Sequence, residues 1–225
     1  MRIDIYSDTI CPWCFIGKRR LERALAERPQ EDLKISWKAF QLNPQMPREG
    51  IDRQRYLELK FGGPAGARQV YDQVRQVGVQ EGIDFAFEAI EHTPNTLESH
   101  RLIRHAASAG LQDQVVQALF DAYFLEGRNI GDGEVLVASA AAAGLDPDAV
   151  RAYLASDEDR DSVAAEDAHA RYIGIQGVPT YILNGKYVLS GAQPPEILFN
   201  MFDLGREEDH KTAEASAWAE PQPEA

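Results

Sequence analysis

The sequence predicts an α/β fold in which short strands lie at both ends of the chain and a long helical segment lies between them. Residues 2–7, 33–40 and 180–190 are rich in β-branched and aromatic side chains, whereas residues from about 45 to 172 carry apolar side chains at helical spacing. With 225 residues, the chain can form one large domain or a small domain that carries an insertion.

The first strand leads directly into a helix. "RIDIYSD" alternates apolar and polar residues, and "CFIGKRRLERALAERP" has apolar residues at helical spacing up to Pro29. Pro12 suits the first helical position, where a missing N–H costs nothing. The only two cysteines, Cys11 and Cys14, therefore lie where the strand turns into the helix.

The remaining elements follow from the same patterns. "LKISWKAF" predicts a second strand, and "TYIL" and "KYVLS" predict a hairpin around Asn184-Gly185. "PPEILFNMF" predicts a closing helix with prolines at its start. The acidic, alanine-rich residues 205–225 are expected to be disordered.

Two cysteines allow a structural disulfide, half of a metal site, or a redox dithiol. They are too few for a disulfide framework, and the N-terminus lacks the apolar run of a secretory signal. Zinc usually takes four ligands, but there is no second CxxC and no histidine pair at helical spacing. A redox dithiol is the favoured interpretation, and no metal site is expected.

The position of the cysteines predicts different roles for them. Free N–H groups and the helix dipole favour a thiolate at Cys11, so we expect its pKa to be lowered and the side chain to be exposed. Cys14 lies one turn into the helix and is expected to be buried, protonated and resolving. The intervening Pro12 and Trp13 are expected to tune the redox potential.

Composition argues against a nucleic acid partner and against a membrane-spanning segment. The formal net charge of −13 repels phosphate backbones, so nucleic acid is not an expected partner. No apolar run approaches the roughly 18–20 residues of a membrane span. We expect a cytoplasmic protein, and the sequence leaves a homo-oligomer open.

"CPWC" after a strand, together with "GIQGVPTYILNGKYVLSGAQPPEILFNMF" at residues 174–202, resembles the thioredoxin superfamily. The long helical segment between these halves resembles the DsbA family. "SDTICPWCFIGKRRLE", "WKAFQLNP" and "HTPNTLESHRL" resemble its FrnE-like branch of polyketide-biosynthesis-associated dithiol–disulfide isomerases. The resemblance covers roughly residues 1–204.

This resemblance implies a thioredoxin fold interrupted by a large all-helical insertion domain. Residues 1–45 and 173–204 would form the discontinuous thioredoxin-like domain, and residues 46–172 the insertion. It also implies a cis peptide bond at Val178-Pro179 that faces the CxxC, with the backbone of Val178 pairing with bound peptide.

The implied activity is thiol–disulfide exchange with protein or glutathione substrates, without a resident cofactor and with glutathione as a candidate redox partner. The resemblance also extends to glutathione-dependent isomerases of aromatic compounds, and it implies that Asn95, Thr96 and His100 line the substrate groove. The spacing of Asn95 and Glu98 alone predicts a helix capping box.

Two alternatives from other classes remain open. One is a glutathione-dependent isomerase or transferase of small aromatic compounds, which commonly has serine at the position of Cys11. The other is a non-catalytic, chaperone-like binding module, which would not need Cys11.

Overall fold

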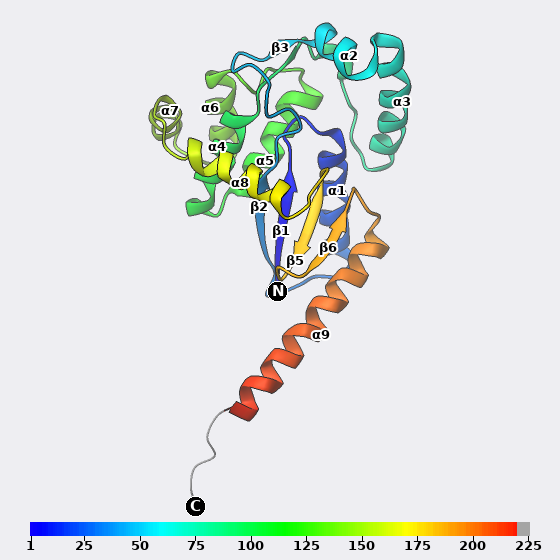
Figure 1. The fold of residues 1–225 in the computed structure, drawn as a ribbon, viewed down its shortest axis with the longest axis vertical. Coiled ribbons are helices and arrows are strands. Elements are labelled where there is room, and N and C mark those ends of the chain that lie inside the picture. The colour runs from blue at the N-terminus through cyan, green and yellow to red at the C-terminus, as the bar shows by residue number, and fades with distance from the viewer. Residues whose placement is uncertain (220–225) are drawn as a thin grey trace, which may run out of the picture.

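The computed structural model describes residues 1–219 and contains a four-stranded sheet at its centre (Figure 1). The strands are β1 (Arg2–Ser7), β2 (Lys34–Ala39), β5 (Thr180–Leu183) and β6 (Tyr187–Ser190), in the order β2-β1-β5-β6. β2 pairs parallel to β1, whereas β5 pairs antiparallel to both β1 and β6. The predicted pairing of the two ends of the chain is therefore confirmed.

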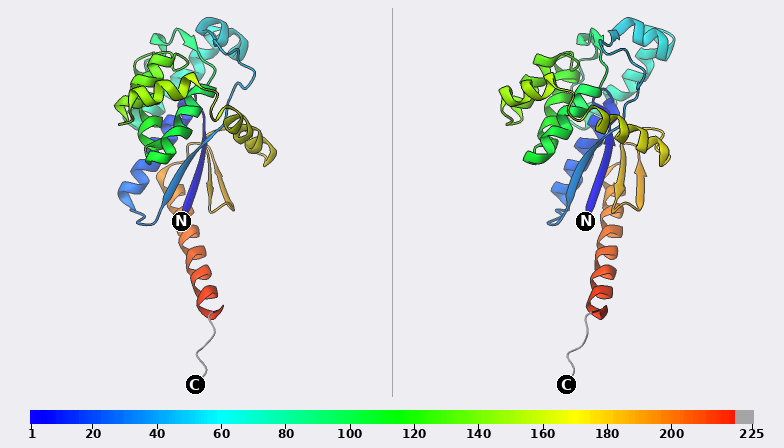
Figure 2. Two further views of the ribbon diagram at one scale, coloured as in Figure 1. Left: turned by 90° about the vertical axis from the view of Figure 1, so that its left-hand side faces the viewer. Right: turned by 60° about the vertical axis from the view of Figure 1, so that its left-hand side comes forward.

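Helix α1 (Pro12–Glu27) and the first part of α9 (Pro195–Ala219) pack against one face of this sheet, and the end of α8 (Arg160–Tyr172) lies on the other side (Figure 2). The β5–β6 hairpin turns at Asn184 and Gly185, whose φ values of 51° and 71° match the predicted Asn-Gly turn. The peptide bond between Val178 and Pro179 is cis, which confirms the prediction.

The chain between β2 and β5 forms the expected helical insertion. It also contains a two-residue antiparallel ladder of β3 and β4, which periodicity did not predict. The elements in order are β3 (Ile51–Asp52), α2 (Arg53–Phe61), α3 (Pro64–Gln80), the 3-10 turn η1 (Phe87–Ala89), β4 (His92–Thr93), α4 (Leu97–His105), the 3-10 turn η2 (Ala106–Ala109), α5 (Gln112–Phe120), the π turn η3 (Asp121–Leu125), α6 (Gly133–Ala142), α7 (Pro147–Ala155) and α8 (Arg160–Tyr172).

Aromatic side chains join the insertion to α1. The Phe15 ring stacks on Phe120 with centroids 5.1 Å apart and meets the edge of Phe85 at 5.9 Å. All three residues are at most 3% exposed. Because Phe15 follows Cys14 directly, this shared core fixes the helix that carries the cysteines.

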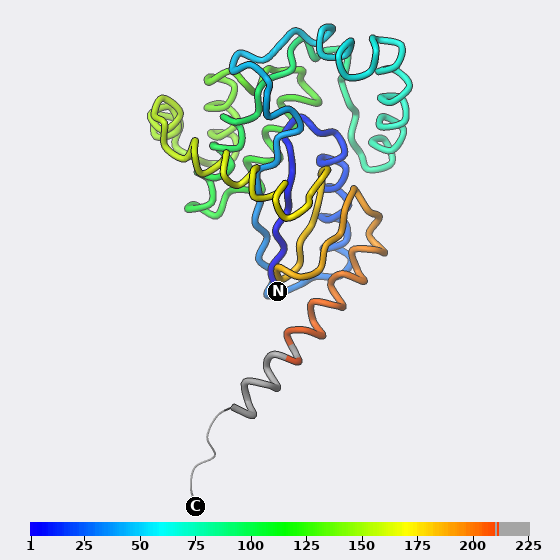
Figure 3. Tube along the Cα trace, in the orientation of Figure 1, coloured from blue at the N-terminus to red at the C-terminus, as the bar shows by residue number. Residues whose placement is uncertain are grey.

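Residues 205–225 were expected to be disordered, and this prediction is wrong for the first residues of that range. The tube in Figure 3 shows α9 continuing past Leu204, and Gly205 packs near the side chain of Met1. Glu208 pairs with Lys186 at 2.9 Å, and Asp209 pairs with the N-terminal amine at 3.1 Å. Residues 220–225 lie outside the described part of the chain.

Candidate active site

The Cys-Pro-Trp-Cys segment forms the start of α1, as predicted. Cys11 is the N-cap residue, with φ −96° and ψ 112°, and Pro12 occupies the first turn. The Cys11 N–H donates to the carbonyl of Asp8 at 3.0 Å, and the Cys14 N–H donates to the carbonyl of Cys11 at 3.0 Å. The strand-to-helix turn is therefore closed by its own backbone hydrogen bonds.

Both cysteines are free thiols, and both are buried. Cys14 is 1% exposed, as expected, but Cys11 is only 5% exposed, so the predicted exposure of Cys11 is wrong. The helix position suggested an open thiol, but the insertion and the loop before β5 cover this end of α1 (Figure 1). A substrate must therefore reach Cys11 through a narrow opening or a local movement.

The loop with the cis peptide bond faces the nucleophile. The thiol of Cys11 lies 3.7 Å from the carbonyl oxygen of Val178, within hydrogen-bonding range for sulfur. Gly17 makes the approach of α1 to this loop feasible, because a Cβ there would lie 2.9 Å from Pro179 and 2.5 Å from the Tyr181 hydroxyl. The structure thus brings Cys11, Val178 and Pro179 together.

The two thiols have opposite acidities. A hydrogen bond from Cys14 lowers the pKa of Cys11, helped by the backbone N–H groups of Cys14 and Trp13, while burial and the charge of Asp8 oppose it. Burial raises the pKa of Cys14 well above its ordinary value, as do its hydrogen bond to Cys11 and the charge there. A thiolate at Cys11 and a thiol at Cys14 is therefore the favoured state. The N–H groups at the helix N-terminus lower the pKa of Cys11 as predicted, but the hydrogen bond from the Cys14 side chain lowers it more.

Polar groups at the end of β1 and just after it also reach the second cysteine. The Ser7 hydroxyl and the Asp8 N–H lie at the Cys14 sulfur, where both favour its ionised form. These groups can stabilise a transient thiolate at Cys14 when that residue has to attack.

A buried Asp–His pair lies beside the cysteines. Asp8 is 0% exposed, and its Oδ2 accepts the Leu42 N–H at 2.6 Å. Its Oδ1 lies 3.6 Å from His100 Nε2, and neither of these two atoms has a hydrogen-bond partner in the described residues. His100 was expected near the substrate groove. Its contact with Asp8 was not predicted, because the sequence separates them widely.

Asn95 and Thr96 lie at the start of α4, but no capping box forms. The Asn95 side chain accepts the Leu97 N–H at 2.9 Å and donates to the Met46 carbonyl at 2.7 Å. Glu98 instead forms ion pairs with arginines of α4 and α8. Asn95 thus fastens the loop after β2 to α4, and a role of Asn95 and Thr96 in substrate binding stays a prediction.

The basic residues of α1 are paired with carboxylates. Lys18 is 2% exposed and contacts Glu22 and Asp113, and Arg20 and Arg23 both bind Glu81. Their positive charge is therefore largely compensated near the cysteines. No group of side chains suited to a metal ion occurs among residues 1–209 and 211, whose side chains the structure describes. Within the same range, no helix has the length and apolar character needed to cross a membrane.

Comparison with known proteins agrees with this geometry. The family model described as "DSBA-like thioredoxin domain" matches residues 2–202. A solved structure described as a probable DsbA oxidoreductase from Streptomyces coelicolor is 31% identical, with a TM-score of 0.80, and the match covers 100% of this chain and 93% of that one. The cytosolic disulfide reductase DsbM from Pseudomonas aeruginosa, solved with GSH, is 17% identical with a TM-score of 0.61, covering 97% and 99% of the two chains.

A curated relative, the uncharacterized protein YwbO from Bacillus subtilis, is 26% identical over 198 residues, which are 88% of this chain and 93% of that protein. The thioredoxin fold with a helical insertion is common to the chain and the solved structures. With its paired cysteines at the start of α1 and a family match from residue 2 to residue 202, the chain belongs to the DsbA-like thioredoxin domain family.

Proposed function

We propose that the protein is a thiol–disulfide oxidoreductase or isomerase with Cys11 as nucleophile and Cys14 as resolving thiol. The observation that carries the proposal is the asymmetry of the two sulfurs at the start of α1. The pKa of Cys11 is lowered by the hydrogen bond from Cys14, whereas burial raises the pKa of Cys14. Disulfide exchange requires this division, because the thiolate is the attacking form.

The proposed reaction has two steps. The Cys11 thiolate attacks one sulfur of a substrate disulfide, forms a mixed disulfide and releases the other substrate sulfur as a thiolate. Cys14 then loses its proton, attacks the Cys11 sulfur and releases the second substrate thiolate. The products are a Cys11–Cys14 disulfide and a reduced substrate, and the reverse sequence oxidises a substrate dithiol.

The groups around the cysteines support these steps. Ser7 and the Asp8 N–H favour ionised Cys14 at the moment of its attack. The carbonyl of Val178 lies beside Cys11, where the backbone of a bound peptide can pair with this loop. Pro12 and Trp13 separate the two thiols and tune their potential.

For the finer assignment we propose the FrnE-like branch and a cytoplasmic location. The stretches around Cys11, Asn95 and Pro179 support the branch, and the solved cytosolic neighbour supports the compartment. The proposed substrates are protein or glutathione thiols and disulfides, without a resident cofactor or metal. Nucleic acid and membranes are not proposed as partners, given the net charge of −13 and the short apolar runs.

The test is insulin reduction in defined glutathione buffers, with wild type, Cys11→Ser and Cys14→Ser. Wild type should reduce insulin, Cys11→Ser should be inactive, and Cys14→Ser should accumulate mixed disulfides. Wild-type activity in Cys11→Ser would instead favour the chaperone-like module. Glutathione-dependent turnover of an aromatic substrate that survives loss of Cys14 would favour the isomerase.

A further inference from the structure

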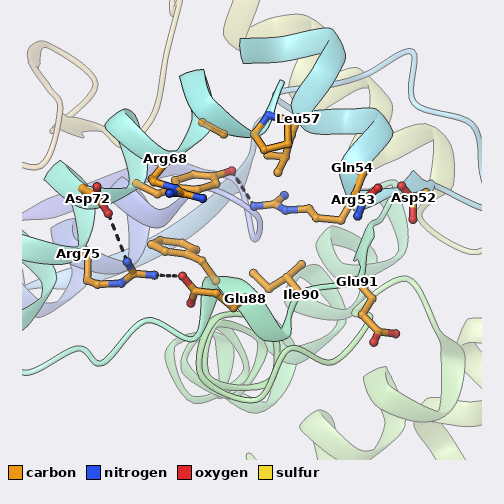
Figure 4. A pocket seen from close by; sticks show the side chains of 14 residues that line it. Asp52, Arg53, Gln54, Leu57, Arg68, Asp72, Arg75, Glu88, Ile90 and Glu91 are labelled. Carbon is orange, nitrogen blue, oxygen red and sulfur yellow. Dashed lines mark hydrogen bonds and ion pairs between the residues drawn. The ribbon is translucent and has the colours of Figure 1, made fainter. Parts of the chain in front are cut away.

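A pocket of about 490 Å³ lies between α2, α3 and the segment from η1 to β4 (Figure 4). Its wall combines apolar side chains with two stacked rings, Tyr71 and Phe87, whose centroids are 4.5 Å apart. The apolar part includes Leu57, Ala67 and Ile90. Such a surface suits a flat or apolar organic group.

Arg53, at the start of α2, brings a buried positive charge into this pocket. It is 8% exposed, and its guanidinium donates to the hydroxyls of Tyr71 at 2.6 Å, Thr93 at 3.1 Å and Tyr123 at 3.4 Å. All three partners are neutral, and no carboxylate among the side chains that the structure describes, residues 1–209 and 211, forms an ion pair with it. The three bonds use only three of the five N–H donors of an arginine.

The acidic side chains that line the pocket do not compensate Arg53. Asp72 and Glu88 both pair with Arg75, at 3.4 Å and 2.6 Å. Asp52 accepts the Arg55 N–H at the start of α2, and Figure 4 shows the Glu91 carboxylate directed away from the guanidinium. Because a buried charge without a counter-charge is costly, the pocket favours an anion from outside the chain.

A second cation lies at the rim of the same pocket. Arg68 of α3 is exposed and forms no hydrogen bond or ion pair with another described residue. Figure 4 shows its side chain on the pocket side of α3. It is therefore available to an anion that enters the pocket.

Aromatic contacts connect the pocket wall to α1. Burial raises the pKa of Tyr71 to about 12, although the charge of Arg53 lowers it, so the ring that lines the pocket keeps its hydroxyl proton. The rings of Phe87 and Phe85 stack with centroids 4.8 Å apart, and Phe85 contacts Phe15 beside Cys14. The inner wall of the pocket thus continues into the core that holds α1.

We propose that this pocket binds the carboxylate of a small molecule, with Arg53 as its buried charge partner and the Tyr71–Phe87 stack against its flat or apolar body. As a substrate subsite this rests on the proposed exchange function, but binding itself does not require a thiol. Two sources share the chemistry: an aryl or alkyl carboxylate, and the terminal carboxylate of a thiol peptide such as glutathione.

Calorimetric titration of the reduced protein with phenylacetate and with phenylacetamide tests the anion site. The two probes differ in charge and react with neither cysteine. Phenylacetate should bind at least about tenfold more tightly, the size expected for a hydrogen-bonded charge. Equal affinities, or no binding of either probe, would overturn the proposal.

Variants locate the site. Arg53→Gln should abolish the preference for the acid, whereas Arg55→Gln, two residues along the same helix and outside the pocket, should preserve it. Retention of the preference in Arg53→Gln would contradict the assignment. If Arg53→Gln does not fold, Leu57→Trp places a fluorescent reporter on the pocket wall. Phenylacetate should change its emission, and saturating acid without any change would contradict the location.

S-methylglutathione, which cannot exchange disulfides, distinguishes the two sources. Tighter binding than phenylacetate, still dependent on Arg53, would assign the carboxylate to a thiol peptide, and weaker binding would assign it to a non-peptide acid. Binding in a protein that fails the insulin assay would keep the pocket and remove the exchange function. Exchange activity without carboxylate binding would keep the exchange function and contradict the pocket proposal.

Discussion

At the scale of single residues, the acidity of Cys11 is a balance between hydrogen bonds and the charge of Asp8. The hydrogen bond from Cys14 and the N–H groups of the first helical turn lower its pKa, whereas burial and the Asp8 carboxylate raise it. The charge of Asp8 can be removed from this balance by a single isosteric substitution.

Asp8→Asn should therefore lower the pKa of Cys11 further. The amide oxygen can still accept the Leu42 N–H, so the loop is retained while the negative charge is lost. The thiolate should persist to lower pH, which the absorbance of the thiolate near 240 nm would record during an acid titration. Asp4→Asn, at a partly buried carboxylate that pairs with Arg2, is the matched control. An unchanged or raised pKa in Asp8→Asn would contradict this account.

The sequence identified the two cysteines and the cis proline as site residues, but it did not indicate which side chains surround them. Cys11, Cys14 and Pro179 are identified by local motifs, which can be recognised without knowledge of how the chain packs. The burial of Cys11 and the contact between Asp8 and His100 depend on how the insertion covers α1. Such contacts join residues far apart in the chain, and periodicity carries no information about them.

At the scale of elements, Gly17 allows α1 to lie directly against the strand after the cis proline. Gly17→Ala should destabilise the fold by about 1–3 kcal/mol, because the added methyl group would overlap Pro179 and the buried Tyr181. Urea unfolding would measure the loss. Gly133→Ala, at the start of α6 with no atom near its Cβ, should be nearly neutral. Equal stability of both variants would show that α1 does not pack as described.

The elements themselves were largely predictable. Apolar spacing located the long helices of the insertion, and the Asn-Gly pair located the β5–β6 turn. The β3–β4 ladder was missed because two residues per strand show no alternation. The capping box was wrong because Glu98 has arginine partners from α4 and α8, which compete with the backbone N–H it was expected to accept.

At the scale of the whole molecule, ion pairs as well as the aromatic core connect α1 to the insertion. Glu81, at the end of α3, has a side chain only 5% exposed and binds both Arg20 and Arg23 of α1. The expected thioredoxin fold with an insertion is confirmed, but the sequence did not indicate this connection. The exact domain boundaries at residues 45 and 173 stay a prediction.

Glu81→Gln should destabilise the protein by about 1–3 kcal/mol, because it leaves the mostly buried Arg20 without its counter-charge. Glu58→Gln, which breaks an exposed pair with Arg55, should change stability by no more than about 0.5 kcal/mol. Chemical denaturation of both variants at the same pH makes the comparison. A larger loss in Glu58→Gln would contradict the role given to Glu81.

The central claim is that Cys11 is the ionised nucleophile and Cys14 its protonated partner. Brief alkylation of the reduced protein with iodoacetamide at pH 6, followed by mass spectrometry of the labelled peptides, tests it most directly. The lowered pKa of Cys11 and the raised pKa of Cys14 predict that the label is found predominantly on Cys11. Equal labelling, or preferential labelling of Cys14, would contradict the account.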